Sequence, residues 1–158
     1  MATSKDSKRN DPLPTFCFWV HIPKLGTDKA FFKSVSGLRY EHEVIPVRAG
    51  GANDTTFNLV GSVKWSPLVL KQGFIAGSPY KFLEWREAWV SGSEMTRYSG
   101  TIIQLNTALQ AVVGWDFTNG WPSKWEIGEY DASKNELQIE TLEISHDGLK
   151  LNKNPPTT

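Results

Sequence analysis

The chain has 158 residues, with 17 Lys and Arg against 17 Asp and Glu, so its formal net charge is zero. This balance excludes the surplus of positive charge on which non-specific binding of nucleic acids depends. The length suits one domain with one core, which we expect over residues 11–150, between a flexible polar lead at residues 1–10 and a loose polar tail at residues 151–158. No apolar run reaches the roughly 18 residues of a membrane span, so we expect a soluble, leaderless protein.

Alternating apolar and polar residues near the start of the chain predict a strand. Over residues 16–22, Phe18 and Val20 alternate with Trp19, so large apolar side chains lie on both faces of this strand. We therefore expect both faces to be covered, by a helix or by a neighbouring subunit. Pro23 is expected to close the strand.

Two further alternating stretches, residues 39–47 and 57–65, predict a pair of strands. Pro46 has no N–H to donate to a ladder, so we expect it to break the first strand and to mark an edge, where another chain can pair. The polar connection over residues 48–56 exceeds the about two to five residues of ordinary hairpin loops. Something outside its own subunit is expected to hold it.

One helix is predicted from residue 79 to about residue 90. Ser78 followed by Pro79 is a typical helix start, because serine caps the free N–H groups and proline suits the first helical position. Aromatic residues then recur at helical spacing and predict a buried face: Phe82, Trp85 and Trp89. The charged residues between them are expected to face water: Glu84, Arg86 and Glu87.

The rest of the chain predicts more strands. Residues 101–105 and 111–117 alternate across a short polar turn, which indicates a hairpin. Asn119-Gly120 then signals a turn or a bulge. The final strand, residues 135–145, changes its apolar phase, and a bulge near Thr141 would reconcile the two halves.

The residues that could carry chemistry form no catalytic or metal-binding pattern. The three histidines lack the short spacings of a zinc site, and Cys17, the only cysteine, cannot form an intramolecular disulfide. Two carboxylate pairs share strand faces, Glu41 with Glu43 and Glu136 with Glu140, as the acid and base of a glycoside hydrolase could. Alternation of charge along a strand explains both pairs better. We expect no enzyme activity, no cofactor and no metal.

The seven tryptophans of the chain suggest another class of function, because exposed aromatic rings stack on sugars. Most of these tryptophans share faces with apolar residues, where core packing is the usual fate: Trp65, Trp85, Trp89, Trp115 and Trp121. Trp19 and Trp125 have no such assignment. A monomeric carbohydrate-binding β-sandwich that uses Trp19 and Trp125 therefore stays open as the alternative.

Ten short motifs follow one another in an order that resembles a known family. They are Val35-Ser-Gly-Leu38, Glu41-x-Glu43-x-Ile45, Arg48-Ala-Gly-Gly51, Leu59-Val-Gly61, Lys64-Trp65, Leu70-Lys-Gln-Gly73, Trp85-Arg86, Trp115-x-Phe117, Asn119-Gly-Trp-Pro122 and Ile139-Glu-Thr-Leu-Glu-Ile-Ser-His-Asp-Gly-Leu149. The chain is similar, over about residues 11–150, to the tail tube proteins of contractile phages and of phage-tail-like contractile injection systems.

The resemblance implies a mainly β, Hcp-like fold, in which two packed antiparallel sheets and one α-helix at about residues 79–90 form a β-barrel-like subunit. It implies hexameric rings that stack into a rigid inner tube, which sheath contraction drives through a target envelope while the tube conducts cargo. The contact between subunits and rings would be the long connection: Val47, Arg48, Ala49, Gly50, Gly51, Ala52, Asn53, Asp54, Thr55, Thr56 and Phe57. Candidate lumen-facing residues are Glu136, Gln138 and Glu140, and the helix would face the sheath through Glu84, Arg86 and Glu87.

The implied partners are other copies of the chain, a sheath protein, baseplate or spike and tail-terminator proteins, and an effector protein or DNA in the lumen. Neither sequence-specific binding of nucleic acid nor insertion into a membrane by the subunit itself is expected. Assembly in the cytoplasm is implied, within a virion or a phage-tail-like particle. A phage tube, a bacterial injection particle and a type VI secretion tube all remain possible.

Overall fold

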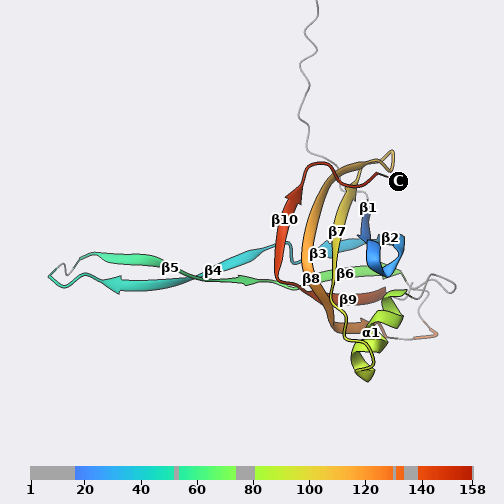
Figure 1. Ribbon diagram of the computed structural model, residues 1–158, viewed down its shortest axis with the longest axis horizontal. Helices are drawn as coiled ribbons and strands as arrows, with labels where there is room; N and C mark the ends of the chain where they lie inside the picture. The colour runs from blue at the N-terminus through green and yellow to red at the C-terminus, as the bar shows by residue number, and fades with distance from the viewer. Residues whose placement is uncertain (1–16, 52–53, 74–80, 130, 134–138, 158) are drawn as a thin grey trace, which may run out of the picture.

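The computed structural model describes residues 17–51, 54–73, 81–129, 131–133 and 139–157, which form a curved β-structure and a long ribbon that projects from it (Figure 1). No helix in these ranges combines the length and the apolar character that a bilayer crossing requires. In chain order the elements are β1 (Cys17–Ile22), η1 (Pro23–Leu25), β2 (Thr27–Phe32), β3 (Ser34–Ser36), β4 (Tyr40–Arg48), β5 (Thr56–Trp65), β6 (Leu68–Gly73), α1 (Lys81–Ser91), β7 (Tyr98–Leu105), β8 (Ala111–Ile127), β9 (Ile139–Ser145) and β10 (Gly148–Asn152).

The body is an antiparallel sheet that curves back on itself. Its strands lie in the order β2-β1-β7-β8-β9-β6-β3, and β10 pairs with β8. Although β2 and β3 stand at opposite ends of this order, only Lys33 separates them in the chain, and its N–H donates to the carbonyl of Lys71 in β6. The sheet order is therefore nearly cyclic, which confirms the expected barrel-like subunit.

The long strand β8 joins the two halves of this body. Its first part pairs with β7 and β10, and its second part pairs with β9 (Figure 1). The Asn119-Gly120 signal marks a bulge here and not a hairpin turn: Asn119 has a φ of 51°, the register against β7 shifts beside it, and the strand continues to Ile127.

The last long strand of the sequence prediction differs from the observed one. β9 begins at Ile139 and pairs with β6 without a register shift, so the expected bulge near Thr141 is wrong. The irregularity lies in β8 instead, between Pro122 and Lys124. Because Glu140, Leu142 and Ile144 alternate in one phase, Glu140 shares the face of two core residues.

The core lies inside the curve of the sheet and beneath α1. It is built from apolar side chains of six strands and of the helix: Val20, Ile22, Phe32, Leu68, Leu70, Phe82, Trp85, Ile102, Phe117, Leu142 and Ile144. A second, smaller cluster lies on the opposite face of β1 and β7, where Trp19 pairs across from Ile103 and packs with Leu105. Both faces of β1 are thus covered, as its sequence predicts.

The helix confirms the predicted spacing of its aromatic residues. Phe82 and Trp85 are buried, while Trp89 stacks on Trp121 with ring centroids 5.2 Å apart. The indole N–H groups of Trp85 and Trp89 both donate to the carbonyl of Thr96, which ties the loop after the helix to its inner face. Pro79, the predicted first helical residue, lies outside the described residues.

The end of the chain is more ordered than the prediction of a tail from residue 151 suggests. Leu151 and Asn152 belong to β10, and the Asn152 amide donates to the Asp116 carboxylate at 3.2 Å. Beyond the strand, Pro155 lies so close to Gly114 that an added Cβ there would meet it at 2.9 Å. The last described residues therefore pack against the outer face of β8.

Candidate functional site: the projecting arm

The ribbon of β4 and β5 is called the arm from here on, and it extends away from the body on one side (Figure 1). Pro46 does not end β4, contrary to prediction, because the strand continues to Arg48 and Pro46 pairs with Asn58. A two-stranded ribbon has only one ladder, so a proline whose missing N–H lies on the open side costs no hydrogen bond. Arg48 pairs with Thr56, which leaves residues 49–55 as the tip.

The base of the arm is fixed to the body by backbone and polar contacts. Gly37 has a φ of 86°, and a Cβ added there would lie 1.9 Å from the carbonyl oxygen of Pro67, so only glycine fits where the two ends of the arm cross. The Ser66 N–H donates to the Arg39 carbonyl at 3.2 Å, and the Arg39 Nε donates to the Ser66 hydroxyl at 2.9 Å.

Aromatic rings form a second layer at this base. Tyr40 and Trp65 lie opposite each other with ring centroids 5.4 Å apart, and Trp65 contacts His146 at 5.9 Å. The Nε2 atom of His146 lies 3.0 Å from the Ser66 carbonyl. Burial lowers the pKa of His146 below its ordinary value, because burial disfavours the charged imidazolium, although the Ser66 contact opposes this effect. The folded base of the arm therefore favours the neutral form of the His146 ring.

The distal half of the arm carries an apolar face that is about half exposed among the residues that the structure describes. Beyond a register shift after His42, Ile45 pairs with Leu59 and Val47 pairs with Phe57, so all four side chains lie on one side of the ribbon. We call these four residues the arm face. Their exposed fractions are 44% for Ile45, 42% for Val47, 54% for Phe57 and 54% for Leu59. A two-stranded ribbon is marginally stable in water by itself, so this face is suited to a partner.

The structure brings together some of the predicted contact residues and adds others. Val47, Arg48, Thr56 and Phe57 belong to the strands of the arm, while Ala49, Gly50, Gly51, Asp54 and Thr55 form the described part of the tip, and Ala52 and Asn53 lie outside the described residues. Sequence reasoning missed Ile45 and Leu59 as candidate contacts. The sequence nevertheless contained a signal for Ile45 and Leu59. Apolar residues occur on both faces of these two strands, whereas only one face of an ordinary ribbon is covered by its own subunit, so the other apolar face indicates a contact with a partner.

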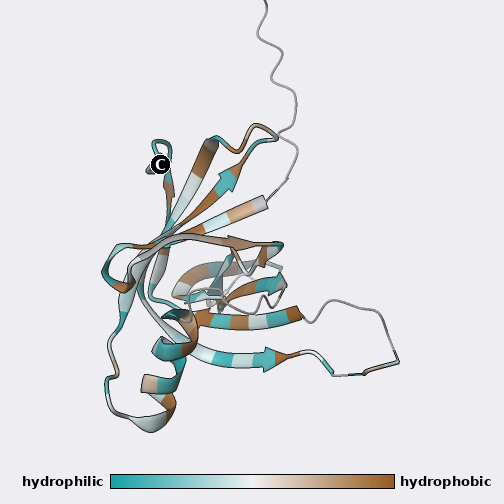
Figure 2. Cartoon of the chain, turned by 90° about the vertical axis from the view of Figure 1, so that its right-hand side faces the viewer, coloured by the Kyte–Doolittle hydropathy of each residue, from teal (hydrophilic) through white to brown (hydrophobic). Residues whose placement is uncertain are grey.

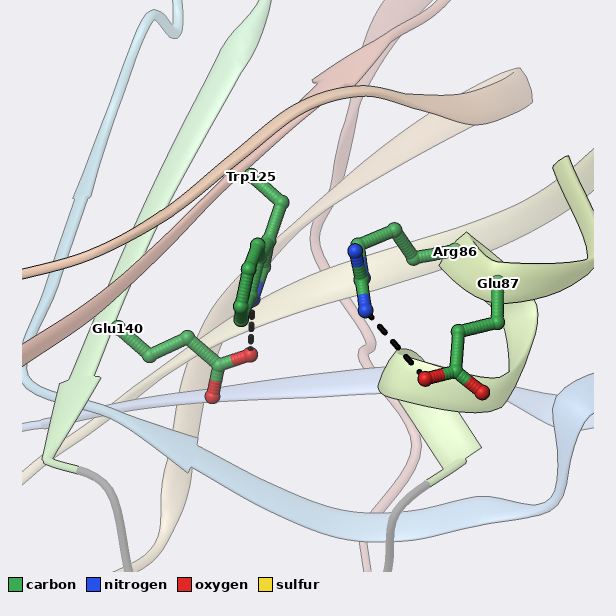
Figure 3. A network of polar contacts seen from close by, with 4 residues as sticks. All are labelled: Arg86, Glu87, Trp125 and Glu140. Atoms are coloured by element: carbon green, nitrogen blue, oxygen red, sulfur yellow. Dashed lines mark hydrogen bonds and ion pairs between the residues drawn. The ribbon is translucent and has the colours of Figure 1, made fainter. Parts of the chain in front are cut away.

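The predicted sheath-facing residues divide into two kinds. Glu84 and Glu87 are exposed, as predicted. The Arg86 side chain, however, is only 21% exposed, and its guanidinium carbon lies 4.1 Å from the centre of the Trp125 ring. The prediction that Arg86 faces water is therefore wrong, since stacking on the indole holds it against the body (Figure 3).

Glu140 takes part in the same group of side chains. Its carboxylate accepts a hydrogen bond from Trp125 Nε1 at 2.6 Å (Figure 3). It accepts another from the Gln72 amide at 2.9 Å. Both carboxylate oxygens are thus bound inside the subunit. Of the other candidate lumen residues, Glu136 and Gln138 lie outside the described residues.

The carbohydrate-binding alternative loses the two tryptophans on which it depended. Trp19 is 5% exposed, and Trp125 has one ring face under Arg86 and its N–H on Glu140, so neither offers a free platform for a sugar. Glu41 and Glu43 lie on the exposed arm, where Glu43 accepts from the Ser62 hydroxyl at 3.0 Å. Within the described ranges, no group of three or more His, Cys, Asp or Glu is arranged to hold a metal.

Comparison with known proteins adds a family to this geometry. The family profile described as T4-like virus tail tube protein gp19 matches residues 14–150. Search of the curated proteins gives no significant match. A chain in the cryo-EM structure of the anti-feeding prophage (AFP) baseplate is 25% identical, with a TM-score of 0.76 over 90% of this chain and 96% of that one.

Two further solved structures share the fold. A chain of the PVC extracellular contractile injection system, in its extended sheath-tube complex, is 21% identical with a TM-score of 0.77, covering 98% of this chain and 100% of that one. A type six secretion system protein is 12% identical with a TM-score of 0.59, covering 86% of this chain and 82% of that one.

Proposed function

Because the chain belongs to the family of T4-like virus tail tube proteins, we propose that the arm is the element through which its subunits join into a tube. The protein is a structural tail tube subunit of a contractile injection system or phage tail, and its family is not enzymatic. The single domain over residues 11–150 is the unit that repeats. The observation that carries the proposal is the exposed arm face.

Exposed apolar side chains support this role by their distribution. Among the described residues, 14 large hydrophobic side chains are exposed, and eight of them belong to the arm: Tyr40, Val44, Ile45, Val47, Phe57, Leu59, Val60 and Val63. Figure 2 colours the body by hydropathy, in a view in which the arm points away from the reader. A monomer rarely leaves so much apolar surface on one slender element, because such a surface drives association. A second copy of the chain is the partner that a tube subunit always has nearby.

The other proposed contacts follow from the same placement. Tube subunits stack as hexameric rings, and residues 47–57 meet the neighbouring subunit or ring. The exposed Glu84 and Glu87 of α1 face the sheath. Glu136 and Gln138 are proposed to line the lumen, whereas the carboxylate of Glu140 is held inside the subunit by Trp125 and Gln72.

Proposed partners outside the tube come from the settings of similar chains. Those chains occur in a sheath-tube complex, in a baseplate and in a sheath/tube terminator. We place this chain in an equivalent particle, assembled in the cytoplasm, with sheath, baseplate or spike, and terminator proteins as neighbours. An effector protein or DNA would be the cargo that passes through the lumen.

Deletion of residues 49–54 tests the role of the arm. The barrel core contains no residue of the arm tip, so the variant should keep its circular dichroism spectrum and thermal transition. Negative-stain microscopy and sedimentation should show wild-type tubes and, for the variant, only subunits or single rings. Long tubes formed by the deletion variant would refute the proposed role of the tip; the arm face remains in this variant and is tested by the substitutions below.

A further inference from the structure

A cavity of about 570 Å³ opens on the outer face of β1 and β7, away from the main core. Its walls come from strands and from the turn between β7 and β8: Trp19, Phe31, Leu105, Leu109, Gln110 and Ala111. We call it the Trp19 pocket. Thr157, near the end of the chain, also reaches it, and none of the described residues that line it is ionisable. Such a pocket suits apolar side chains and rejects a charged ligand.

Two features of the Trp19 pocket indicate an occupant. Trp19 is buried, yet its indole N–H has no acceptor among the described residues, which is costly for a buried donor. Leu109 stands at the mouth with 58% exposure and a φ of 58°. A leucine in the left-handed region is uncommon, because its side chain crowds the backbone, and an exposed turn would ordinarily hold Gly, Asn or Asp there. A leucine at this position is explained by an apolar contact with a partner.

We propose that the Trp19 pocket receives the arm face of a second copy of this chain. The inference deepens the proposed function and rests on it, because it names the surface on which the arm lands. Ile45, Val47, Phe57 and Leu59 carry no charge, which matches the uncharged pocket, and the arm's backbone carbonyls supply acceptors of the kind that Trp19 Nε1 lacks. Phe31, at the pocket rim, is 49% exposed, so the receiving surface is also apolar.

The positions of the two surfaces favour contact between copies. The arm leaves the body on one side, whereas β1, β2 and the turn after β7 lie on the other (Figure 1). With strands of nine and ten residues, the arm extends roughly 30 Å, far enough to lie on a neighbour. Each copy can therefore donate its arm and receive another at once. A contact between two different surfaces of this kind closes into a ring or propagates as a filament.

Two variants and their mixture test the inference. The arm variant combines Phe57→Asp with Leu59→Asp, and the pocket variant combines Phe31→Asp with Leu109→Asp; all four side chains are exposed, so the barrel should fold in both. Each variant alone should lose tube formation, with pelletable protein reduced at least about tenfold. An equimolar mixture should give a two-subunit complex by sedimentation velocity, because the intact arm of one variant meets the intact pocket of the other. Val90→Asp on α1 is the matched control and should form tubes.

The possible outcomes distinguish a failure of the proposed function from a failure of the proposed pairing between the arm and the Trp19 pocket. Tubes from the arm variant would overturn the proposed function. If the arm variant fails but the pocket variant forms tubes as the wild type does, the arm contact stands and the Trp19 pocket is not its receptor. If both variants fail and their mixture forms no complex, the pairing of arm with pocket is likewise overturned.

A cross-link gives an independent reading of the same contact. Phe57→Cys with Leu109→Cys, in a Cys17→Ser background, should yield intermolecular products with a short bis-maleimide, identified by mass spectrometry. Replacing Leu109→Cys by Val90→Cys should abolish them. Equal cross-linking at both positions would refute the placement of the arm.

Discussion

Shortening one side chain of the arm face should weaken assembly by an amount that the structure sets. We choose Leu59→Ala, because Leu59 is 54% exposed in the subunit and lies outside the barrel core. Burial of a whole leucine side chain contributes about 1.5 to 3 kcal/mol, so covering the exposed half contributes about 1 kcal/mol after allowance for the remaining alanine. Each subunit added to a tube brings one arm, so this loss counts once per subunit. We expect the critical concentration for tube formation to rise about fivefold.

The measurement is the concentration of subunit that remains in the supernatant after tubes are pelleted. Asn58→Ala is the matched control, since Asn58 is the neighbour of Leu59 on the opposite face of the arm and pairs with Pro46. It should leave the critical concentration within about twofold of the wild type. A Leu59→Ala protein that assembles at the wild-type concentration, or an Asn58→Ala protein that is equally impaired, would show that the arm face is not the buried surface.

Three further predictions concern the subunit itself. Gly37→Ala should be much more destabilising in urea denaturation than Gly51→Ala, because both glycines have positive φ but only Gly37 faces a backbone oxygen at 1.9 Å; equal losses would contradict the steric reason. Glu140→Ala should cost about 1 to 3 kcal/mol of unfolding free energy, because an indole N–H and an amide lose their acceptor, whereas Glu140→Gln should cost less. The pKa of His146 is lower in the folded protein than its ordinary value of 6.5, so its neutral ring contributes its full stabilisation above pH 6.5. This contribution is lost as the pH falls through the folded-state pKa. His146→Gln should therefore flatten the decline of melting temperature on acidification, and an unchanged decline would assign it to other groups.

Local signals predicted the elements well where a residue's neighbours in the chain decide its structure. The spacing of Phe82, Trp85 and Trp89 predicted the helix and its buried face, because helical periodicity is set within a few residues. The large side chains on both faces of the first strand predicted double coverage, which the cluster around Trp19 confirms.

Contacts between distant residues were beyond this kind of prediction. Arg86 was expected in water, but Trp125 lies beneath its guanidinium, and nothing near Arg86 in the chain reveals that ring. Pro46 was expected to end its strand, yet the arm has an open side on which a proline is harmless. The nearly cyclic sheet likewise depends on β2 and β3 meeting opposite edges, which no local pattern encodes.

The two partners of the proposed contact form on different timescales during synthesis and folding. The arm is a local hairpin, and hairpins close within microseconds. The receiving wall requires β1 to find β7, whose paired residues Trp19 and Ile103 are separated by about 80 positions, and such distant pairing is slow. In a nascent chain the arm hairpin can therefore form transiently before the Trp19 pocket exists. A subunit could then join a neighbour only after the barrel of that neighbour had closed and its Trp19 pocket had formed. This requirement would keep incompletely folded chains out of the growing tube.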